Sequence, residues 1–281
     1  MKLLQKPVRL ALVGSPAFLD AWTDPVSRTR ECVIAKGEPE AVVVETAAEA
    51  VVAAQAGRHV LFGVPGETMV GMRDVLATCR DAGVHLTAGG CLRHAPSNVL
   101  IKERVDSGKL GAPGLLRVHR WRGSTEAPWE CRVFADIDLA LHLMGGLPDT
   151  LFAMTRREGA YLQVHLGFPG GAMAVLDFAT SLPPGQCYDS LSLVGTKGTA
   201  YADDHSNTHL LFTGAAPRAL FSRGGDGRLG ELRAFLAGIH NPCVPEAEWM
   251  AACKVVDGVQ ESLSLDGPVT FGEGGLYHES A

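Results

Sequence analysis

Strand and helix patterns alternate along the first hundred residues, and this alternation constrains the fold more than any other feature of the sequence. Short apolar runs predict buried strands at residues 8–13, 41–44, 59–62 and 84–87. Helical stretches are predicted at residues 47–56, 67–82 and 97–107. The second of these helices has its apolar side chains on one face, and a glycine follows it as a stop. Such alternation predicts a parallel sheet with helices on its faces.

One connection in this half does not fit a complete parallel sheet. Residues 31–35 predict another strand, yet only residues 36–40 separate it from the strand at 41–44. A parallel crossover needs about a dozen residues or more. We therefore expect this part of the sheet to have lost either a helix or a strand.

The pattern changes near Gly111. Strand-like runs then follow in series, at residues 115–121, 151–155, 161–166, 172–178 and 188–194. Most are joined by short Gly or Pro turns, and short connections favour antiparallel neighbours. Helices are predicted at residues 136–144 and 245–263. This half of the chain predicts an α+β domain built on a large open, mainly antiparallel sheet.

Composition and charge argue against several classes of partner. The net charge is −6 and no block of Lys and Arg occurs, so no nucleic-acid partner is expected. No segment has the length and hydrophobicity of a signal-peptide core or a membrane span, which predicts no membrane contact. The 7 cysteines are widely spaced and lack a C-x-x-C pair, which is typical of free thiols in a reducing compartment. We expect a cytoplasmic protein, and the absence of an H-E-x-x-H pattern predicts no metal site.

Two motifs carry a resemblance to a known family. Residues 57–61 read Gly-Arg-His-Val-Leu, and residues 106–111 read Asp-Ser-Gly-Lys-Leu-Gly. They are similar to the G-K-H-V-L-x-E-K-P and D-S-G-K-L-G segments of the glucose–fructose oxidoreductase, inositol dehydrogenase and rhizopine catabolism family, written Gfo/Idh/MocA. Residues 136–153 and 192–204 resemble later segments of the same family, so the resemblance spans nearly the whole chain.

The resemblance implies two domains and an activity. Residues 1–112 would form a Rossmann-like dinucleotide-binding domain, truncated in this chain, and residues 113–281 a Gfo/Idh/MocA-like sheet domain. The family implies NAD(P)-dependent hydride transfer on sugars, inositols or related alcohols. It also implies a homo-oligomer assembled through the broad face of the C-terminal sheet.

The phosphate-binding loop departs from the family pattern. The G-x-G-x-x-G/A fingerprint uses glycines for a tight turn, for close approach of the backbone to the pyrophosphate and for helix packing. Residues 14–19 retain only Gly14. Pro16 takes the second glycine position, where it has no N–H to offer, and Leu19 takes the third.

The next two cofactor positions are also altered. Lys36 stands where the family has the acid that binds the adenosine ribose. It could meet a 2′-phosphate, or it could be a solvated surface residue. The E-K-P motif aligns with Gly63, Val64 and Pro65, so a valine replaces the lysine that supports hydride transfer.

The acid–base pair of the family is missing as well. Counted back from Asp138, its histidine and aspartate positions hold Ala135 and Cys131. Loss of a general base alone costs about two to four orders of magnitude in rate. Together with the altered cofactor positions, this predicts that the family chemistry is lost.

These substitutions favour a pseudoenzyme, because fold and function can separate. We predict a Gfo/Idh/MocA-like protein without NAD(P) that binds a small polar ligand or acts as an oligomeric scaffold or regulator. Two alternatives stay open. One is an active NAD(P)-dependent oxidoreductase that acts on a sugar, inositol or related polyol through a rebuilt cofactor loop. The other is a cofactor-independent lyase or isomerase.

Four side chains are candidates for a remnant cleft. Arg93 and His94 follow a predicted strand, and the carboxyl ends of parallel strands usually form ligand sites. Asp138 and His142 lie four residues apart on one helix face. They form either a residual acid–base pair or a packing or surface pair, in which case Asp136 would cap the helix.

Two weaker candidates complete the set. Cys131 beside Arg132 is a candidate thiol nucleophile, because a cation lowers a thiol pKa, but no histidine is adjacent in sequence. In the strand over 119–122, the side chains alternate, so that the two arginines share one face, and the histidine and tryptophan share the other. The pattern could present cations to an acidic ligand, or it could form a sheet face at an oligomer contact.

Overall fold

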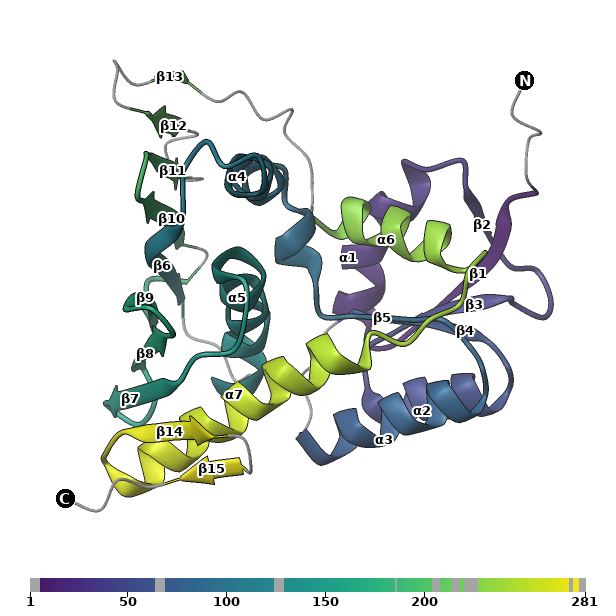
Figure 1. The fold of residues 1–281 in the computed structure, drawn as a ribbon. Helices are drawn as coiled ribbons and strands as arrows, with labels where there is room; N and C mark the ends of the chain where they lie inside the picture. Colours follow the sequence, from purple (N-terminus) through teal and green to yellow (C-terminus); the bar gives the residue numbers. More distant parts are fainter. Residues whose placement is uncertain are drawn as a thin grey trace. The chain divides into compact units, whose positions relative to one another are not determined.

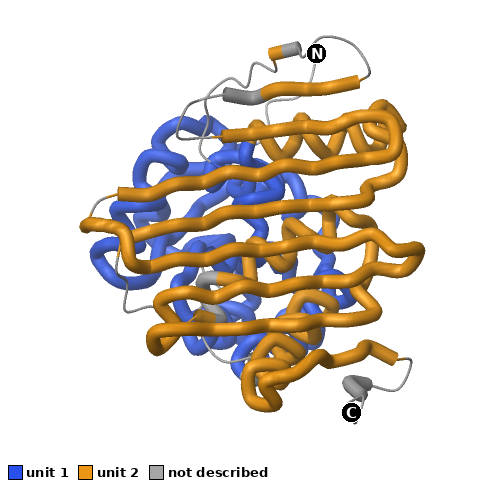
Figure 2. Tube along the Cα trace, turned by 90° about the vertical axis from the view of Figure 1, so that its left-hand side faces the viewer, with its two compact units in different colours: residues 1–95, 224–250 blue, residues 96–223, 251–281 orange. Residues whose placement is uncertain are grey.

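The computed structural model describes residues 6–63, 69–123, 129–184, 186–203, 208–213, 218–219, 227–272 and 275–277. Their helices and strands form two compact units (Figures 1 and 2). Residues 1–95 and 224–250 form unit 1, and residues 96–223 and 251–281 form unit 2. Unit 1 is built on a parallel sheet and unit 2 on a mainly antiparallel sheet, which confirms the predicted α/β fold class.

The two units are not consecutive stretches of the chain. The predicted ranges, 1–112 and 113–281, divide the chain once, whereas residues 224–250 return to unit 1. The returning segment contains α6 (Gly227–Gly238), a helix that the sequence patterns did not predict. Its apolar side chains enter the core of unit 1, and their burial stabilises the return: Leu232, Phe235 and Leu236.

Five parallel strands form the sheet of unit 1, in the order β2-β1-β3-β4-β5. They are β1 (Val8–Val13), β2 (Cys32–Ile34), β3 (Ala41–Val44), β4 (His59–Phe62) and β5 (Leu86–Ala88). All four residues of β3 are buried, as expected for the central strand of a sheet covered on both faces.

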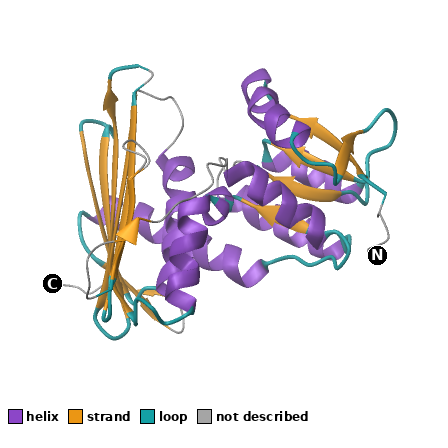
Figure 3. Ribbon diagram, turned by 90° about the horizontal axis from the view of Figure 1, so that it is seen from above, coloured by secondary structure: helices purple, strands orange, loops and turns teal. Residues whose placement is uncertain are grey.

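Helices cover both faces of this sheet (Figures 1 and 3). On one face, α1 (Pro16–Ser27) packs with α6 over a shared apolar core. On the other face lie α2 (Ala47–Gln55) and α3 (Met69–Asp81), which contact each other. A short 3-10 helix, η1 (Cys91–His94), follows β5 and packs against α6.

The short connection between β2 and β3 is possible because the two strands pair with different halves of β1. Residue Ile34 at the end of β2 and Ala41 at the start of β3 both lie level with Leu10. The connecting segment 35–40 therefore only has to cross one strand, a distance of about 9–10 Å, and does not have to run back along the sheet. Its ends are fixed by hydrogen bonds from Ala35 N to Leu10 O (2.9 Å) and from Glu40 N to Arg9 O (2.8 Å).

This strand order shows which strand of a complete dinucleotide-binding sheet is absent from the five-stranded sheet. A six-stranded dinucleotide-binding sheet has the order 3-2-1-4-5-6. Removing its outermost strand, the third, leaves the five-stranded order seen here. No helix lies between β2 and β3, since residues 35–40 are all described and form turns and loops. The chain has therefore lost that strand together with the helices that would flank it.

Ten strands form the sheet of unit 2, in the order β13-β12-β11-β10-β6-β9-β8-β7-β14-β15. They are β6 (Pro113–Gly123), β7 (Thr150–Arg156), β8 (Tyr161–Phe168), β9 (Ala172–Leu182), β10 (Cys187–Gly195), β11 (Thr199–Asp203), β12 (Thr208–Phe212), β13 (Arg218–Ala219), β14 (Val269–Gly272) and β15 (Gly275–Tyr277). The pairing of β6 with β9 is parallel and the other described pairings are antiparallel.

Helices of unit 2 cover one face of this sheet (Figure 3). They are α4 (Pro96–Asp106), α5 (Trp129–Met144) and the part of α7 (Glu246–Leu265) after residue 250. We call this the inner face, and the opposite one the outer face. Side chains alternate between them, as in β8, where Leu162 and Val164 are buried on the inner face and Tyr161 is exposed on the outer face. Among the described residues of unit 2, no helix covers the outer face.

The helix α5 begins earlier than predicted. The sequence pattern indicated a helix over 136–144, and the structure shows one from Trp129 to Met144. Asp136 therefore lies in the middle of α5, so the interpretation of Asp136 as a helix cap is wrong. Within the described part of the chain, no helix combines the length and hydrophobicity needed to cross a membrane.

Candidate functional site

In unit 1, the carboxyl ends of the parallel strands bring together the segments that correspond to a nucleotide site. Gly14 follows β1, Glu45 follows β3, and Gly63 follows β4. Gly14 has no room for a side chain, because a Cβ atom there would lie 2.7 Å from the Phe18 ring and 2.8 Å from the Glu45 side chain. The turn glycine is thus retained because the chain packs on itself at this point.

The carboxylate of Glu45 binds the turn that would receive the phosphates. Ser15 N donates a hydrogen bond to Glu45 Oε2 (2.5 Å), and Ser15 Oγ donates one to Glu45 Oε1 (3.0 Å). The start of a helix is a favourable place for an anion, because its backbone N–H groups and dipole point there. In this chain the anion is a side chain of the protein itself.

The remaining donors of the same turn are also committed or absent. Pro16 is the first residue of α1 and has no N–H. Phe18 N donates to the Ser15 hydroxyl (3.3 Å), which caps the helix. The groups that a diphosphate would use are therefore largely unavailable, and the sequence reasoning on Pro16 missed the role of Glu45. An acid directly after a buried strand, next to the strand that ends in the glycine turn, was the signal in the sequence.

The end of β4 is filled by an aromatic side chain. A Cβ atom on Gly63 would lie 2.8 Å from the Trp22 ring, and Trp22 is fully buried in the core of unit 1. The glutamate of the family E-K-P motif therefore has no space here, because the indole of α1 occupies it. Val64 and Pro65, the next two positions of that motif, lie outside the described residues.

Lys36 does not stand at the edge where a ribose would bind. Strand β2 ends level with Leu10, and β1 continues to Val13, so the chain leaves the sheet roughly 10 Å before the carboxyl edge. The sequence motif aligned Lys36 with the family's ribose-binding acid. Because β2 ends before the carboxyl edge of the sheet, Lys36 does not reach the place where that acid would lie.

Arg93 and His94 are tied into the packing of unit 1. Arg93 pairs with Glu248 of α7. Burial lowers the pKa of His94, and the neighbouring Arg93 lowers it further, so both favour the neutral imidazole. A buried acid also occupies this edge, because Gly90 N donates to Glu231 Oε1 of α6 (3.0 Å). The two predicted cleft residues are therefore brought together, but in a structural contact with α6 and α7.

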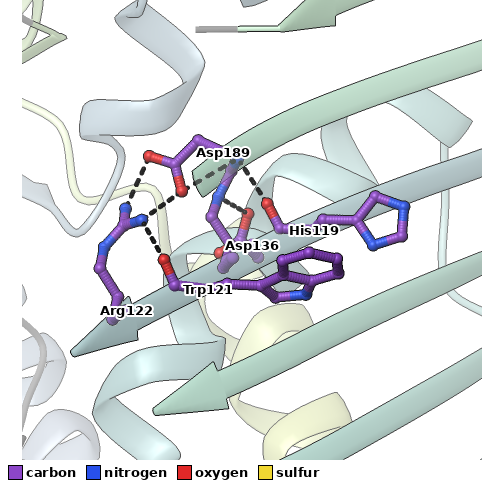
Figure 4. A network of polar contacts seen from close by, with 6 residues as sticks. His119, Trp121, Arg122, Asp136 and Asp189 are labelled. Atoms are coloured by element: carbon purple, nitrogen blue, oxygen red, sulfur yellow. Dashed lines mark hydrogen bonds and ion pairs between the residues drawn. The ribbon is translucent and has the colours of Figure 1, made fainter. Parts of the chain in front are cut away.

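On the inner face of unit 2, four charged side chains form a chain of ion pairs (Figure 4). Arg120 of β6 pairs with Asp136 of α5 (2.9 Å) and approaches Asp189 of β10 (3.9 Å). Arg122 pairs with Asp189 through both of its terminal nitrogens. Complete burial raises the pKa of the Asp136 carboxyl, although Arg120 acts in the opposite direction. The cluster carries no net charge and lies directly after Ala135 in α5.

The other candidates on α5 find little support. Asp138 is buried, His142 is partly buried, and both interact with other residues. That arrangement suits packing better than an exposed acid–base pair. The side chains of Cys131 and Arg132 lie outside the described residues, although α5 runs through both.

The predicted alternation along β6 is confirmed. Arg120 and Arg122 enter the inner-face cluster, whereas His119 and Trp121 lie together on the outer face with ring centroids 5.5 Å apart. In the part of the chain that the structure describes, no three His, Cys, Asp or Glu side chains come together to hold a metal ion. The side chains of His205 and His209, four residues apart, lie outside that part.

Comparisons with known proteins agree with this architecture. Residues 99–201 match the GFO/IDH/MocA C-terminal domain. This match places the C-terminal part of the chain among Gfo/Idh/MocA domains. It is 26% identical to the uncharacterized oxidoreductase YrbE of Bacillus subtilis strain 168 over 255 residues, which cover 78% of this chain and 73% of that protein.

Solved structures share the fold over almost the whole length. A dehydrogenase from Chromobacterium violaceum has a TM-score of 0.80 at 16% identity and covers 93% of this chain and 97% of its own. An oxidoreductase from Agrobacterium radiobacter, in complex with NAD+, L-tartaric acid and magnesium, has a TM-score of 0.78 at 15% identity and covers 94% and 98%. At these identities the likeness concerns the fold alone. The chain is thus similar in sequence to an oxidoreductase and, over residues 99–201, to the Gfo/Idh/MocA C-terminal domain.

The residues present do not fit the cofactor that this family implies. Glu45 sits on the phosphate turn, Pro16 removes a donor, and β2 stops short of the ribose position. The first two features affect the pyrophosphate position, and the third affects the ribose position.

Proposed function

We propose that this chain is a Gfo/Idh/MocA relative that does not use NAD(P) or transfer hydride. It acts instead by binding a small polar ligand, or as an oligomeric scaffold or regulatory partner. The observation that carries the proposal is the pair of hydrogen bonds from Ser15 to the Glu45 carboxylate.

Repulsion between the Glu45 carboxylate and a phosphate is large enough to weaken dinucleotide binding. A phosphate charge about 4 Å from a carboxylate near a protein surface is opposed by roughly 4 kcal/mol. That corresponds to nearly three orders of magnitude in affinity, since each 1.4 kcal/mol is about tenfold. Displacing Glu45 would also leave its carboxylate to find new partners. The turn therefore works against a dinucleotide both by repulsion and by occupation.

The residues at the family's acid–base positions support the same proposal. Ala135 cannot exchange a proton, and the nearest acid, Asp136, is buried and paired with Arg120. A general base must reach the proton that it abstracts. A carboxylate held in a buried ion pair is poorly suited to that task, so the inner face of unit 2 offers a polar surface without an evident proton carrier.

The alternative is an active NAD(P)-dependent oxidoreductase acting on a sugar, inositol or related polyol. It is favoured by the similar fold of an oxidoreductase that binds NAD+. In that case the turn after β1 would have to open and Glu45 would have to move away from Ser15.

Nucleotide binding separates the two functions. Thermal shift and calorimetry would be run with NADH and NADPH on the wild type, on Glu45→Ala and on Glu38→Ala. Glu38 is an exposed acid of unit 1, so its variant matches the charge change away from the turn. A ligand at 100 times its dissociation constant should stabilise the fold by about 2.7 kcal/mol.

We expect no shift for the wild type or Glu38→Ala. A gain of affinity for either nucleotide confined to Glu45→Ala would identify the carboxylate as the barrier. A clear shift and saturable binding in the wild type would contradict the proposal and support the alternative. Assembly through the C-terminal sheet stays a prediction, which sedimentation velocity of the full chain would test.

A further inference from the structure

A cavity of about 830 Å³ lies at the amino ends of the parallel strands in unit 1. Its lining comes from the start of β1, from residues 38–40 before β3, from the turn between α2 and β4, and from Ile239 and His240 after α6. Because the strands are parallel, the turn that Glu45 binds lies at the opposite, carboxyl edge of the sheet. The cavity is therefore separate from the nucleotide position. Its size falls within the range of about 300–1,000 Å³ that is usual for ligand sites.

The short connection between β2 and β3 supplies the acidic part of the lining. It places Glu38 and Glu40 at the cavity, and each carboxylate pairs with an arginine of the lining. Glu40 Oε2 accepts a hydrogen bond from Arg9 N (3.0 Å) and lies 3.5 Å from Arg9 Nε. Arg58 donates to Glu38 Oε2 (2.7 Å). The four charges cancel, but the carboxylates are 85% and 50% exposed, and their oxygens can accept further hydrogen bonds.

One cation and one N–H donor of the lining are still available to a ligand. Lys6 precedes β1, and no carboxylate in the described part of the chain pairs with it. His59 also lines the cavity, and His85 N donates a hydrogen bond to His59 Nδ1 (2.9 Å). The neutral ring of His59 therefore carries its proton on Nε2 and can donate it. Burial lowers the pKa of His59, although Glu40 acts in the opposite direction, and burial thus favours this neutral form.

These groups restrict the charge that a ligand can carry. A carboxylate matches the single uncompensated charge of Lys6 and can accept a hydrogen bond from His59. A ligand with several negative charges would also meet Glu38 and Glu40, whereas a cation without a carboxylate would meet Lys6. An ammonium group on the same ligand can bind the exposed carboxylates, and hydrogen bonds between charged groups are the stronger ones. The lining therefore favours a zwitterion over an ion of either sign.

The rest of the lining is largely apolar and can hold a hydrocarbon group. Its apolar side chains are those of Pro7, Val8, Pro39, Ala56 and Ile239. Burial of a hydrocarbon group against them would contribute about 25 cal/mol for each Å² of apolar surface that is removed from water. Amino acids and short peptides combine an ammonium group, a carboxylate and such a side chain in one small molecule.

We propose that this cavity binds a zwitterionic ligand of the amino-acid class, a free amino acid or a dipeptide with an apolar side chain. The ligand carboxylate binds Lys6 and His59, its ammonium group binds Glu38 and Glu40, and its side chain packs on the apolar wall. The proposal does not depend on whether NAD(P) binds, because the site lies at the opposite edge of the sheet.

The test uses L-leucine and L-leucyl-L-leucine as zwitterionic probes, which distinguish the two sizes of ligand. 4-Methylpentanoate and isopentylamine each keep the hydrocarbon group of leucine and only one of its charges, so they are the control probes. Saturation-transfer NMR and calorimetry would be run on the full chain in the wild type, Lys6→Gln and Glu40→Gln. Lys36→Gln and Glu31→Gln are matched control variants, because both residues are exposed in unit 1 and do not line the cavity.

We expect saturable binding of at least one zwitterion and roughly tenfold weaker binding of both control probes. Lys6→Gln and Glu40→Gln should each reduce the affinity for that zwitterion roughly tenfold or more, and the control variants should leave it unchanged. Far-ultraviolet circular dichroism would verify that each variant folds. The proposal is overturned if neither zwitterion binds the wild type, or if a control probe binds as tightly as the zwitterion. Unchanged affinity in Lys6→Gln or Glu40→Gln would overturn it as well, since the ligand would then lie elsewhere.

Discussion

The two units differ in how their polar groups find partners. In unit 1, side chains of the protein itself occupy the carboxyl edge of the sheet: Glu45 binds the turn after β1, and Trp22 fills the space beside Gly63. In unit 2, the charged side chains of the inner-face cluster pair with one another.

The difference follows from what each site has to satisfy. A helix start has backbone donors that need partners whether or not a cofactor is bound, because unpaired polar groups are costly. In this chain the Glu45 carboxylate is such a partner. Side-chain sites behave differently, since oppositely charged residues can neutralise one another and a neutral residue such as Ala135 needs no partner.

The largest expected effect comes from breaking the buried pair in unit 2. Arg120→Met should cost roughly 3–5 kcal/mol, because it leaves the buried Asp136 carboxyl without its cationic partner. Arg120 is 12% exposed and Asp136 4%, so solvent offers little compensation. Urea unfolding, followed by circular dichroism, would measure the loss.

Arg122→Met is the matched control for that prediction. Arg122 is 44% exposed, and exposed ion pairs contribute only about 0–1 kcal/mol. The double variant Arg120→Met/Asp136→Asn should recover part of the lost stability, because no uncompensated charge remains. Equal losses in Arg120→Met and Arg122→Met would show that the inner-face cluster is not electrostatically distinct from a surface pair.

A steric effect of intermediate size is expected in unit 1. Gly63→Ala places a Cβ atom 2.8 Å from the buried Trp22 ring and should destabilise the fold by roughly 1–3 kcal/mol. Gly37→Ala is the control, since a Cβ atom there meets nothing within 4 Å. Thermal unfolding of the single variants and of Gly63→Ala/Trp22→Phe would reveal the coupling. A double variant no more stable than Gly63→Ala alone would contradict the idea that Trp22 fills this space.

Local sequence patterns predicted most strands because those strands are buried apolar runs. The segments 8–13, 41–44 and 59–62 were predicted with the bounds that the structure shows. The helix α1 was missed, although Ser15 and Pro16 are a typical helix start, because Pro16 was considered only as an obstacle to a cofactor.

Contacts between distant residues explain the remaining misses. The stagger of β2 and β3 along β1 depends on register, which no local pattern encodes. The contact of Glu45 with Ser15 depends on which strands become neighbours, and the return of α6 to unit 1 depends on a core that is complete only in the fold. Sequence reasoning thus identified the altered positions in the cofactor site but not the groups that replaced them.

The smallest effect is a difference in how the two units respond to pH. Burial lowers the pKa of His59, His85 and His94 in unit 1. Below about pH 6.5, these histidines bind protons more readily in the unfolded chain than in the native one. Unit 1 should therefore lose stability as the pH falls. Burial raises the pKa of Asp136 in unit 2, so the carboxyl binds its proton more tightly in the native state than in the unfolded state. Its contribution to the stability of unit 2 therefore falls as the pH rises above about 3.9.

Hydrogen exchange with mass spectrometry can read the units separately. Urea midpoints would be measured on peptides from each unit at several pH values between neutral and mildly acidic, after correction for the intrinsic exchange rate. We expect the midpoint of unit 1 to fall with decreasing pH more steeply than that of unit 2. His85→Gln should flatten the pH dependence of unit 1, because one buried imidazole no longer resists protonation. A unit 1 midpoint that stays constant over this range in the wild type would mean that burial does not hold these histidines neutral.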